Sequence, residues 1–299
     1  MCGLCGFVYK DAARTGDVGR VLHGMLLPMG RRGTDSTGVA LYGPREEGTY
    51  VVRARIEANS GTPERVIETL ERAGSVREHS QAGPNLRARV AYEGDLGELT
   101  DRIEADRHVE VFSIGRSMEI VKEVGDADDV QRSAPFSDFD GSHAIGHTRM
   151  ATESVVDVAH SHPFWARPFP DISVVHNGHI TNYHKLRRRL ENKGHRFATG
   201  NDSEGIAVYI ADKLAEGASL EEGLRASVSD LDGTFSYLVS TADGIGCARD
   251  RFALKPLLYT ENDEVAMIAS EEVAIRRVDG DAGLEPRELA AGEVRWWLR

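Results

Sequence analysis

Apolar residues and glycines follow one another over residues 2–9, directly after the first methionine. Such a short apolar run predicts a buried strand. The next apolar positions recur at helical spacing and predict a helix that ends at a glycine turn over residues 30–33. These positions are Val18, Val21, Leu22, Met25, Leu26 and Met29. Beyond the turn, residues 37–42 and 50–56 predict the two strands of a hairpin around Gly43 and Pro44.

The composition becomes more charged over residues 57–140, and we interpret this stretch as an α/β insertion. Within it, residues 63–73 predict an amphipathic helix and residues 117–124 a second helix. An acidic loop is expected over residues 126–138.

The strand pattern resumes at residues 143–149 and 172–176, and three helices are expected after it. These helices cover residues 183–192, 203–215 and 220–229. The last third predicts further strands, separated by Gly, Asp and Asn turns. These strands cover residues 234–240, 245–249, 257–259, 265–269 and 294–298. Two sheets with helices outside them account best for this order, and we expect one domain over residues 1–299, because no repeat or linker divides the chain.

The length and the charge of the chain exclude some classes of function and partner. The 299 residues are enough to bury a proper core. A net charge of −12, spread along the chain, argues against a nucleic-acid partner. No long apolar span or basic leader is visible, so we predict no membrane partner and a cytoplasmic location. The acidity and the excess of arginine over lysine fit a salt-adapted or a GC-rich host, and composition does not separate the two.

Three cysteines occur, Cys2, Cys5 and Cys247. They are too few and too unevenly spaced for a disulfide framework, a four-cysteine zinc site or an iron–sulfur cluster. A redox cofactor would therefore have to lie on another chain. We interpret Cys5 and Cys247 as small buried apolar residues.

Cys2 differs because methionine is removed before small residues, which leaves a thiol and a free α-amine on one residue. The amine has a reference pKa of about 7.7–8.0 and the thiol one of about 8.5, so the amine can accept the thiol proton. Many chains begin with Met-Cys without any such chemistry. Cys2 is therefore a candidate nucleophile only if other residues support it.

Attack of a thiolate on an amide carbonyl creates an oxyanion, which requires donors fixed where the charge develops. Asn177 and Gly178 follow the expected strand 172–176 and offer a side-chain amide and a backbone N–H. An Asn-Gly pair by itself is more often a tight turn.

A glutamine substrate also carries an α-carboxylate and an α-ammonium group. A guanidinium suits the first and a carboxylate the second. Arg149, at a strand end, and Asp202, at a helix start, are the candidates. Taken alone, Arg149 also fits a solvated surface charge, and Asp202 also fits a helix N-cap.

Six segments occur in the order found in class II glutamine amidotransferases, and the chain resembles that family over nearly its whole length. The segments are residues 2–6, 32–38, 146–152, 176–178, 201–204 and 249–271. Each is moderately specific, whereas the ordered set is highly specific. The resemblance implies an α+β fold, a four-layer αββα sandwich of the N-terminal nucleophile hydrolase type.

The same resemblance implies that Cys2 is the nucleophile, with Asn177 and Gly178 as the oxyanion hole. It places three residues around the substrate L-glutamine: Arg149, Thr152 and Asp202. The matches at Arg32, Asp35 and Ser36 imply structural support for the nucleophile strand.

His162 matches a pocket-side position of the family. The pair His160 and His162 also suggests a metal site, but no third ligand stands at a suitable spacing, so we predict no metal. The chain departs from the family at Met150, where Trp or Tyr is common, and at Ala253, where Gly is common.

The chain ends without a phosphoribosyl-binding loop, a sugar-isomerase domain or an adenylating loop. It resembles most the stand-alone glutaminase subunits of glutamate synthase-type systems, and N-methylglutamate synthase subunits look much the same. The resemblance implies a separate synthase subunit that receives ammonia and carries FMN and an iron–sulfur cluster, with no cofactor on this chain. Two other readings stay open, an N-terminal nucleophile amidase for another amide and a non-catalytic subunit that senses glutamine.

Overall fold

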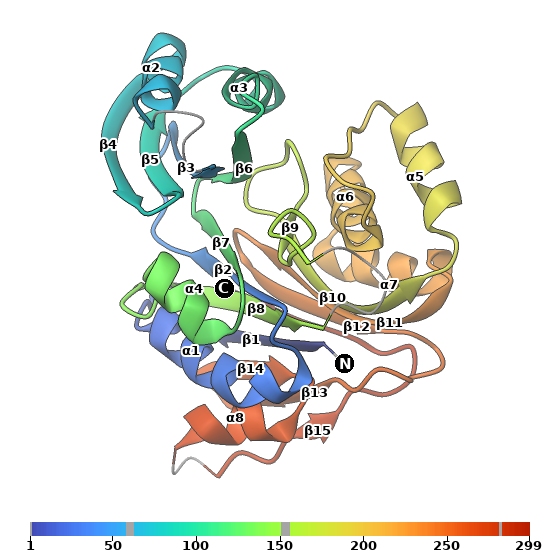
Figure 1. Cartoon of the computed structure of the whole chain (residues 1–299). Coiled ribbons are helices and arrows are strands. Elements are labelled where there is room, and N and C mark those ends of the chain that lie inside the picture. Colours follow the sequence, from blue (N-terminus) through green and yellow to red (C-terminus); the bar gives the residue numbers. More distant parts are fainter. Residues whose placement is uncertain (1, 58–62, 151–155, 281–282) are drawn as a thin grey trace.

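The computed structural model describes residues 2–57, 63–150, 156–280 and 283–299. Two antiparallel sheets that face each other form the centre of the protein (Figure 1). The seven-stranded sheet has the order β15-β13-β14-β1-β8-β2-β7. Its strands are β1 (Gly3–Tyr9), β2 (Ser36–Tyr42), β7 (Met118–Val124), β8 (His143–Arg149), β13 (Leu258–Glu261), β14 (Val265–Ala269) and β15 (Arg287–Glu288). The five-stranded sheet has the order β16-β12-β11-β10-β9. Its strands are β9 (Phe164–Trp165), β10 (Ser173–Ile180), β11 (Gly233–Thr241), β12 (Gly244–Arg249) and β16 (Val294–Leu298).

Helices cover the outer face of each sheet, which completes four layers. Against the seven-stranded sheet pack α1 (Val18–Met29), α4 (Ala127–Ser133) and α8 (Glu272–Asp279), and a short 3₁₀ turn, η1 (Gly30–Arg32), follows α1. Against the five-stranded sheet lie α6 (Asp202–Ala215) and α7 (Leu220–Asp230), and α5 (Tyr183–Asn192) packs on α6. The predicted four-layer αββα arrangement is therefore confirmed.

The central strand β1 shows how the sequence produces these layers. All seven of its residues are buried, because both faces of the strand are covered. Leu4 and Val8 enter the core between the two sheets. Cys5, Phe7 and Tyr9 point the other way, into the core beneath α1. Side chains on a strand alternate between its faces, so one uninterrupted apolar run serves two cores.

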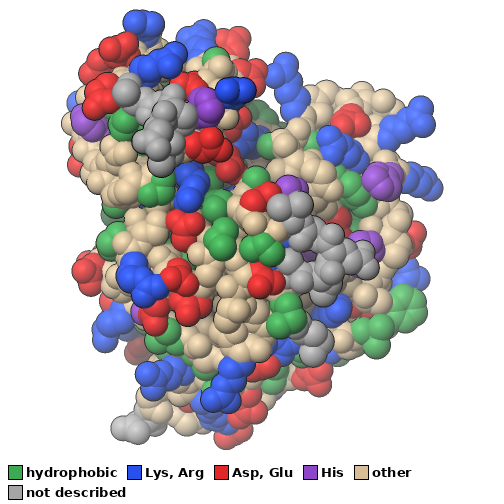
Figure 2. All heavy atoms as spheres, viewed as in Figure 1, with side chains coloured by type: hydrophobic (Ala, Val, Ile, Leu, Met, Phe, Trp, Pro, Cys, Tyr) green, Lys and Arg blue, Asp and Glu red, His purple; other side chains and the backbone are tan. Residues whose placement is uncertain are grey.

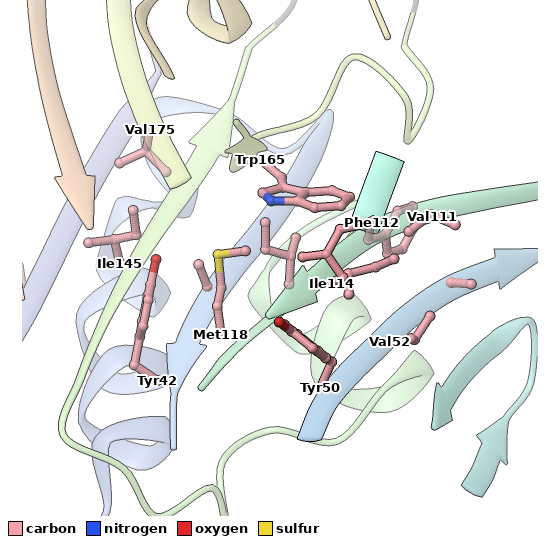
Figure 3. Packing of buried hydrophobic residues seen from close by; sticks show 14 of the residues in the cluster. Tyr42, Tyr50, Val52, Val111, Phe112, Ile114, Met118, Ile145, Trp165 and Val175 are labelled. Atoms are coloured by element: carbon pink, nitrogen blue, oxygen red, sulfur yellow. The ribbon is translucent and has the colours of Figure 1, made fainter. Parts of the chain in front are cut away.

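A third, four-stranded sheet has the order β4-β5-β3-β6. Its strands are β3 (Thr49–Ile56), β4 (Ser75–Ala82), β5 (Asn85–Ala91) and β6 (Val109–Gly115), and α2 (Pro63–Ala73) and α3 (Leu96–Ile103) accompany them. Figure 3 shows Tyr50, Val52 and Ile114 of this sheet in one cluster with Tyr42 and Ile145 of the sandwich. The third sheet thus shares its core with the sandwich.

Two expectations for this region were wrong. Residues 37–42 and 50–56 do not form a hairpin, because β2 pairs with β7 and β8 whereas β3 pairs with β5 and β6. Residues 117–124 form the strand β7 rather than a helix. The buried Glu119 obscured this strand, since it pairs with Arg53 and Arg87 of the third sheet. The expected acidic loop contains α4.

Acidic and basic side chains are intermixed on the face shown in Figure 2. Within the described residues, no helix is long and apolar enough to cross a membrane.

Candidate active site

A pocket of about 550 Å³ opens where the start of β1 meets the ends of β8 and β10 and the start of α6. Six of the seven predicted site residues line it: Cys2, Arg149, His162, Asn177, Gly178 and Asp202. The seventh, Thr152, lies outside the described residues. Segments that are far apart in the sequence thus bring the predicted site together.

Cys2 stands at the mouth of this pocket because β1 runs antiparallel to β8, with Gly3 opposite Thr148. Its Sγ accepts a hydrogen bond from the backbone N–H of Met150 at 3.2 Å. Its carbonyl oxygen accepts from Arg32 Nε at 2.9 Å, and Arg32 in turn pairs with Glu271 at 2.6 Å. Arg32 therefore supports the start of β1, as the sequence predicted.

The other two thiols are remote from this pocket. Cys5 and Cys247 are fully buried. Burial raises the pKa of the Cys247 thiol to about 12 and raises that of Cys5 as well. Both side chains therefore behave as small apolar residues, and among the cysteines only Cys2 lines the pocket.

The side-chain amide of Asn177 is held in one orientation by His147. The Nε2 of His147 lies 3.0 Å from Asn177 Oδ1 and 3.2 Å from the His176 carbonyl oxygen. Both are acceptors, so Nε2 carries the proton and donates it. Asn177 Nδ2 is then directed toward Cys2, where it donates to the Cys2 carbonyl and to Ser270 Oγ, each at 3.1 Å.

Gly178 continues β10 instead of forming a tight turn, and it pairs with Phe235 of β11. Its φ is +133°, and a Cβ at this position would lie 2.0 Å from the Thr234 carbonyl oxygen. Only glycine fits there. The alternative in which Asn177 and Gly178 form a hairpin turn is therefore wrong.

Asp202 is the first residue of α6, but it does not cap the helix. The N-cap is Asn201, whose side chain accepts from the Ser203 N–H at 2.9 Å. Asp202 Oδ2 accepts instead from the Ile180 N–H at 2.9 Å, at the end of β10. The carboxylate thus faces the pocket.

Arg149 occupies the last position of β8 and is only 5% exposed. This burial excludes the alternative of a solvated surface charge. A guanidinium and a carboxylate, Arg149 and Asp202, therefore line one pocket with Cys2. The pocket can accept a ligand that carries both an anionic and a cationic group.

Three buried histidines lie behind these groups, and two of them, His162 and His176, line the pocket. Ser203 Oγ lies 2.8 Å from His162 Nε2 and 2.9 Å from His176 Nδ1, and the His147 and His162 rings stack with centroids 4.0 Å apart. Burial lowers the pKa of all three, that of His147 to about 3, so these histidines are neutral at pH 7. Within the described ranges, no group of three His, Cys, Asp or Glu side chains is arranged to hold a metal.

Several of these supporting residues were not identified from the sequence, namely His147, His176, Ser203 and Ser270. Each lies inside one of the six matched segments, so the segments marked the region. Their roles depend on contacts across the fold, such as the one between His147 and Asn177.

Because several histidines are buried in the neutral form, we expect the protein to lose stability in acid. Burial lowers the pKa of both His143 and His147 to about 3. Their unfolded pKa is about 6.5, so below this pH the unfolded chain binds more protons than the folded one. The stability that these residues contribute is complete above pH 6.5 and is lost as the pH falls. We expect the free energy of unfolding to drop by about 2 kcal/mol per histidine between pH 7 and 5.

Urea unfolding at the two pH values measures this effect. The variant His143→Gln should show a smaller drop between pH 7 and 5 by about the contribution of one histidine. An equal drop in the variant and the parent chain would contradict the assignment.

Comparison with known proteins places this fold and pocket in a family. A model of the glutamine amidotransferase domain matches residues 147–277. The chain is 42% identical over 305 residues to the “Putative glutamine amidotransferase” of Methanothermobacter thermautotrophicus, with 99% of both chains covered. It is 37% identical to the “Glutamine amidotransferase-like protein GlxB” of Rhizobium meliloti, over 92% of this chain and 91% of that protein. The chain belongs to the glutamine amidotransferase family.

Solved structures agree on the fold. One is the glutamine phosphoribosylpyrophosphate amidotransferase from B. subtilis, with 19% identity, a TM-score of 0.62 and 98% of this chain covered. Another is an allosteric regulatory enzyme of purine biosynthesis, with 20% identity, a TM-score of 0.63 and 99% covered. This chain spans 46% of the length of each.

The structure also bears on one departure from the family. Ala253 has a φ of +52°, in the left-handed region that glycine adopts without strain. The chain thus places alanine in a conformation that suits the glycine common elsewhere in the family.

Proposed function

We propose that this chain hydrolyses L-glutamine to L-glutamate and ammonia through a thioester on Cys2, once Met1 has been removed. The observation that carries the proposal is the single pocket that joins Cys2 with Asn177, Arg149 and Asp202. Membership of the glutamine amidotransferase family supports it.

In the proposed reaction, the α-amine of Cys2 accepts the thiol proton and the sulfur forms a bond to the side-chain carbonyl carbon of glutamine. The carbonyl oxygen becomes an oxyanion, for which Asn177 Nδ2 and the Gly178 N–H are the donors. Collapse of this intermediate breaks the carbon–nitrogen bond, and the α-ammonium returns the proton to the departing ammonia. Water then attacks the thioester in the same way, which releases glutamate and restores the thiol.

Recognition of the two ends of glutamine predicts distinct kinetic defects. Arg149→Ala should raise KM for glutamine by roughly 10–100-fold, because it removes a charge-assisted contact to the α-carboxylate. Asp202→Asn should weaken the binding of glutamine but not that of glutaramate, which lacks the α-ammonium group. Steady-state kinetics with both substrates measure this discrimination. Equal losses for both substrates in Asp202→Asn, or unchanged glutamine kinetics in Arg149→Ala, would point to a different substrate.

We further propose that the ammonia passes to a separate cytoplasmic synthase subunit, of glutamate synthase type. FMN and the iron–sulfur cluster would then belong to that subunit. The sequence resemblance supports this acceptor, and it supports an N-methylglutamate synthase subunit nearly as well. Hydrolysis of glutamine labelled with ¹⁵N in the amide, in the presence of each candidate synthase, would show which product receives the label.

The decisive experiment on hydrolysis is the intact mass of the purified chain before and after a glutamine-like diazo ketone, with glutamate release measured in parallel. We expect the mass without Met1, one adduct located on Cys2, and release of glutamate. Absence of both the adduct and glutamate release would favour the subunit that senses glutamine without turnover. An adduct without glutaminase activity would favour another amide as substrate.

A further inference from the structure

A second cavity, of about 660 Å³, lies between the third sheet and the helical side of the five-stranded sheet. Residues of α3 and β6 line it on one side and residues of β9 and α6 on the other, and these elements face each other in Figure 1. No residue lines both this cavity and the glutamine pocket. The start of α6 separates them, because Ser203 faces the glutamine pocket and Glu204 faces the cavity. Its volume is typical of small-molecule sites.

Lys122 of β7 brings a buried amino group to this cavity. The residue is 5% exposed, and its Nζ lies 5.0 Å from the ring centre of Phe112 and 5.5 Å from that of Phe164. Neither a hydrogen bond nor an ion pair to Nζ is present among the described residues. The side chain passes close to Gly38, where a Cβ would lie 3.0 Å from Lys122 Cγ. The same Cβ would lie 2.1 Å from the His162 carbonyl oxygen, so the glycine admits both this carbonyl and the lysine side chain.

The charged form of Lys122 is costly in such a place, because its Nζ has only the faces of Phe112 and Phe164 beside it among the described residues. Burial lowers the pKa of Lys122, and Glu110 partly opposes this effect. Removal of an isolated charge from water costs several kcal/mol even after the protein relaxes. An anionic group bound beside Lys122 would favour its charged form and offset part of this cost.

Most other charged groups around the cavity are already engaged. Arg167 pairs with Glu104 at 2.8 Å, and Arg196 pairs with Asp101 at 2.8 Å. Glu204 accepts from the backbone N–H groups of Ala198 and Thr199, at 2.6 and 2.7 Å. These groups already have partners within the protein, so they stabilise the walls of the cavity and are not available to a ligand.

Glu110 is different, since no ion pair to it occurs within the part of the chain that the structure describes. It lies near Phe112 on β6, and both side chains line the cavity. Trp165 adds an apolar surface near Phe112 (Figure 3). One unpaired cation, one unpaired anion and three aromatic rings therefore face the same cavity.

We propose that this cavity is a second ligand site, which binds a small zwitterion with an apolar body. Its carboxylate pairs with Lys122, its ammonium group pairs with Glu110, and its carbon chain packs against Phe112, Phe164 and Trp165. This site is independent of Cys2 and of the proposed hydrolysis.

Calorimetric titration of the full chain tests the proposal with three probes, 5-aminopentanoate, pentanoate and pentylamine. The titrated chain carries Asp202→Asn, so that binding in the glutamine pocket is weakened. We expect the zwitterion to bind at least tenfold more tightly than pentanoate, and pentylamine to bind least. A chain that binds none of the probes would overturn the proposal, whatever the outcome for glutamine hydrolysis.

Variants in the same background assign the contacts. Lys122→Met should lower the affinity for 5-aminopentanoate and for pentanoate at least tenfold. Glu110→Gln should lower only the affinity for the zwitterion, 5-aminopentanoate. Lys185→Met, at an exposed lysine of α5, is the matched control and should leave all affinities unchanged. Equal affinity of 5-aminopentanoate for Lys122→Met and its parent would refute the site.

Thermal unfolding without a ligand separates binding from a structural role of the lysine. Lys122→Met should unfold at the same temperature as the parent or a higher one, because it removes a buried unpaired charge. A lower unfolding temperature would show that Lys122 supports the fold, and this would count against a ligand as its partner.

Discussion

Replacement of Cys2 by alanine is expected to reduce glutamine hydrolysis by roughly 10⁴-fold or more, because no other thiol reaches the pocket. Alanine is small, so Met1 should still be removed and the α-amine should remain. The fold should be little affected, since Arg32 and Asn177 contact the backbone carbonyl of residue 2, and only the hydrogen bond from Met150 N–H to Sγ is lost. Glutamate release and urea unfolding measure the two effects.

The matched control is Cys247→Ala, which removes a thiol that is fully buried in the sheet and outside the pocket. This variant should lose some stability from the smaller side chain but keep its rate of hydrolysis. An active Cys2→Ala chain would refute the proposed mechanism. Loss of activity in both variants would show only that the fold tolerates neither change.

Replacement of Asn177 by alanine is expected to lower kcat for glutamine by about 10²–10³-fold. The amide Nδ2 is directed toward Cys2, and its loss removes a donor where the oxyanion would form. KM should change little, because the donor acts mainly on the transition state. Pre-steady-state release of ammonia together with steady-state kinetics measures the two quantities.

His147 provides a comparison for this prediction, since its proton orients the Asn177 amide without itself lining the pocket. His147→Leu should lower kcat less than Asn177→Ala does. The double variant should be no worse than Asn177→Ala alone, because both changes remove the same donor. Additive losses would show that His147 acts by another route.

The motif residues could be predicted from the sequence because their chemistry is local. Cys2 was singled out by its place after Met1, and Asn177 and Gly178 by the donors that they offer, and the order of the six segments supported both. Arg149 and Asp202 were named from the charges that glutamine carries. The structure brings all five to one pocket, as the ordered segments led us to expect.

Strand pairing was predicted less well, because it is decided by contacts between distant residues. Residues 37–42 and 50–56 are near in sequence, yet they pair in different sheets. The strand β7 was mistaken for a helix, since its Glu119 is buried through ion pairs with Arg53 and Arg87 of another sheet. No local pattern shows such pairs.

The sequence by itself determined which chemical groups this chain has and the order in which they occur. Through the resemblance to class II glutamine amidotransferases, this order was enough to indicate the αββα fold. Only the tertiary structure decided what surrounds each group. It assigned the helix cap to Asn201 rather than Asp202, oriented Asn177 through His147, and buried Lys122 beside a second cavity. The physical reason is that hydrogen-bond partners and burial come from remote segments, as in the contact between Cys2 and Met150, 148 residues apart.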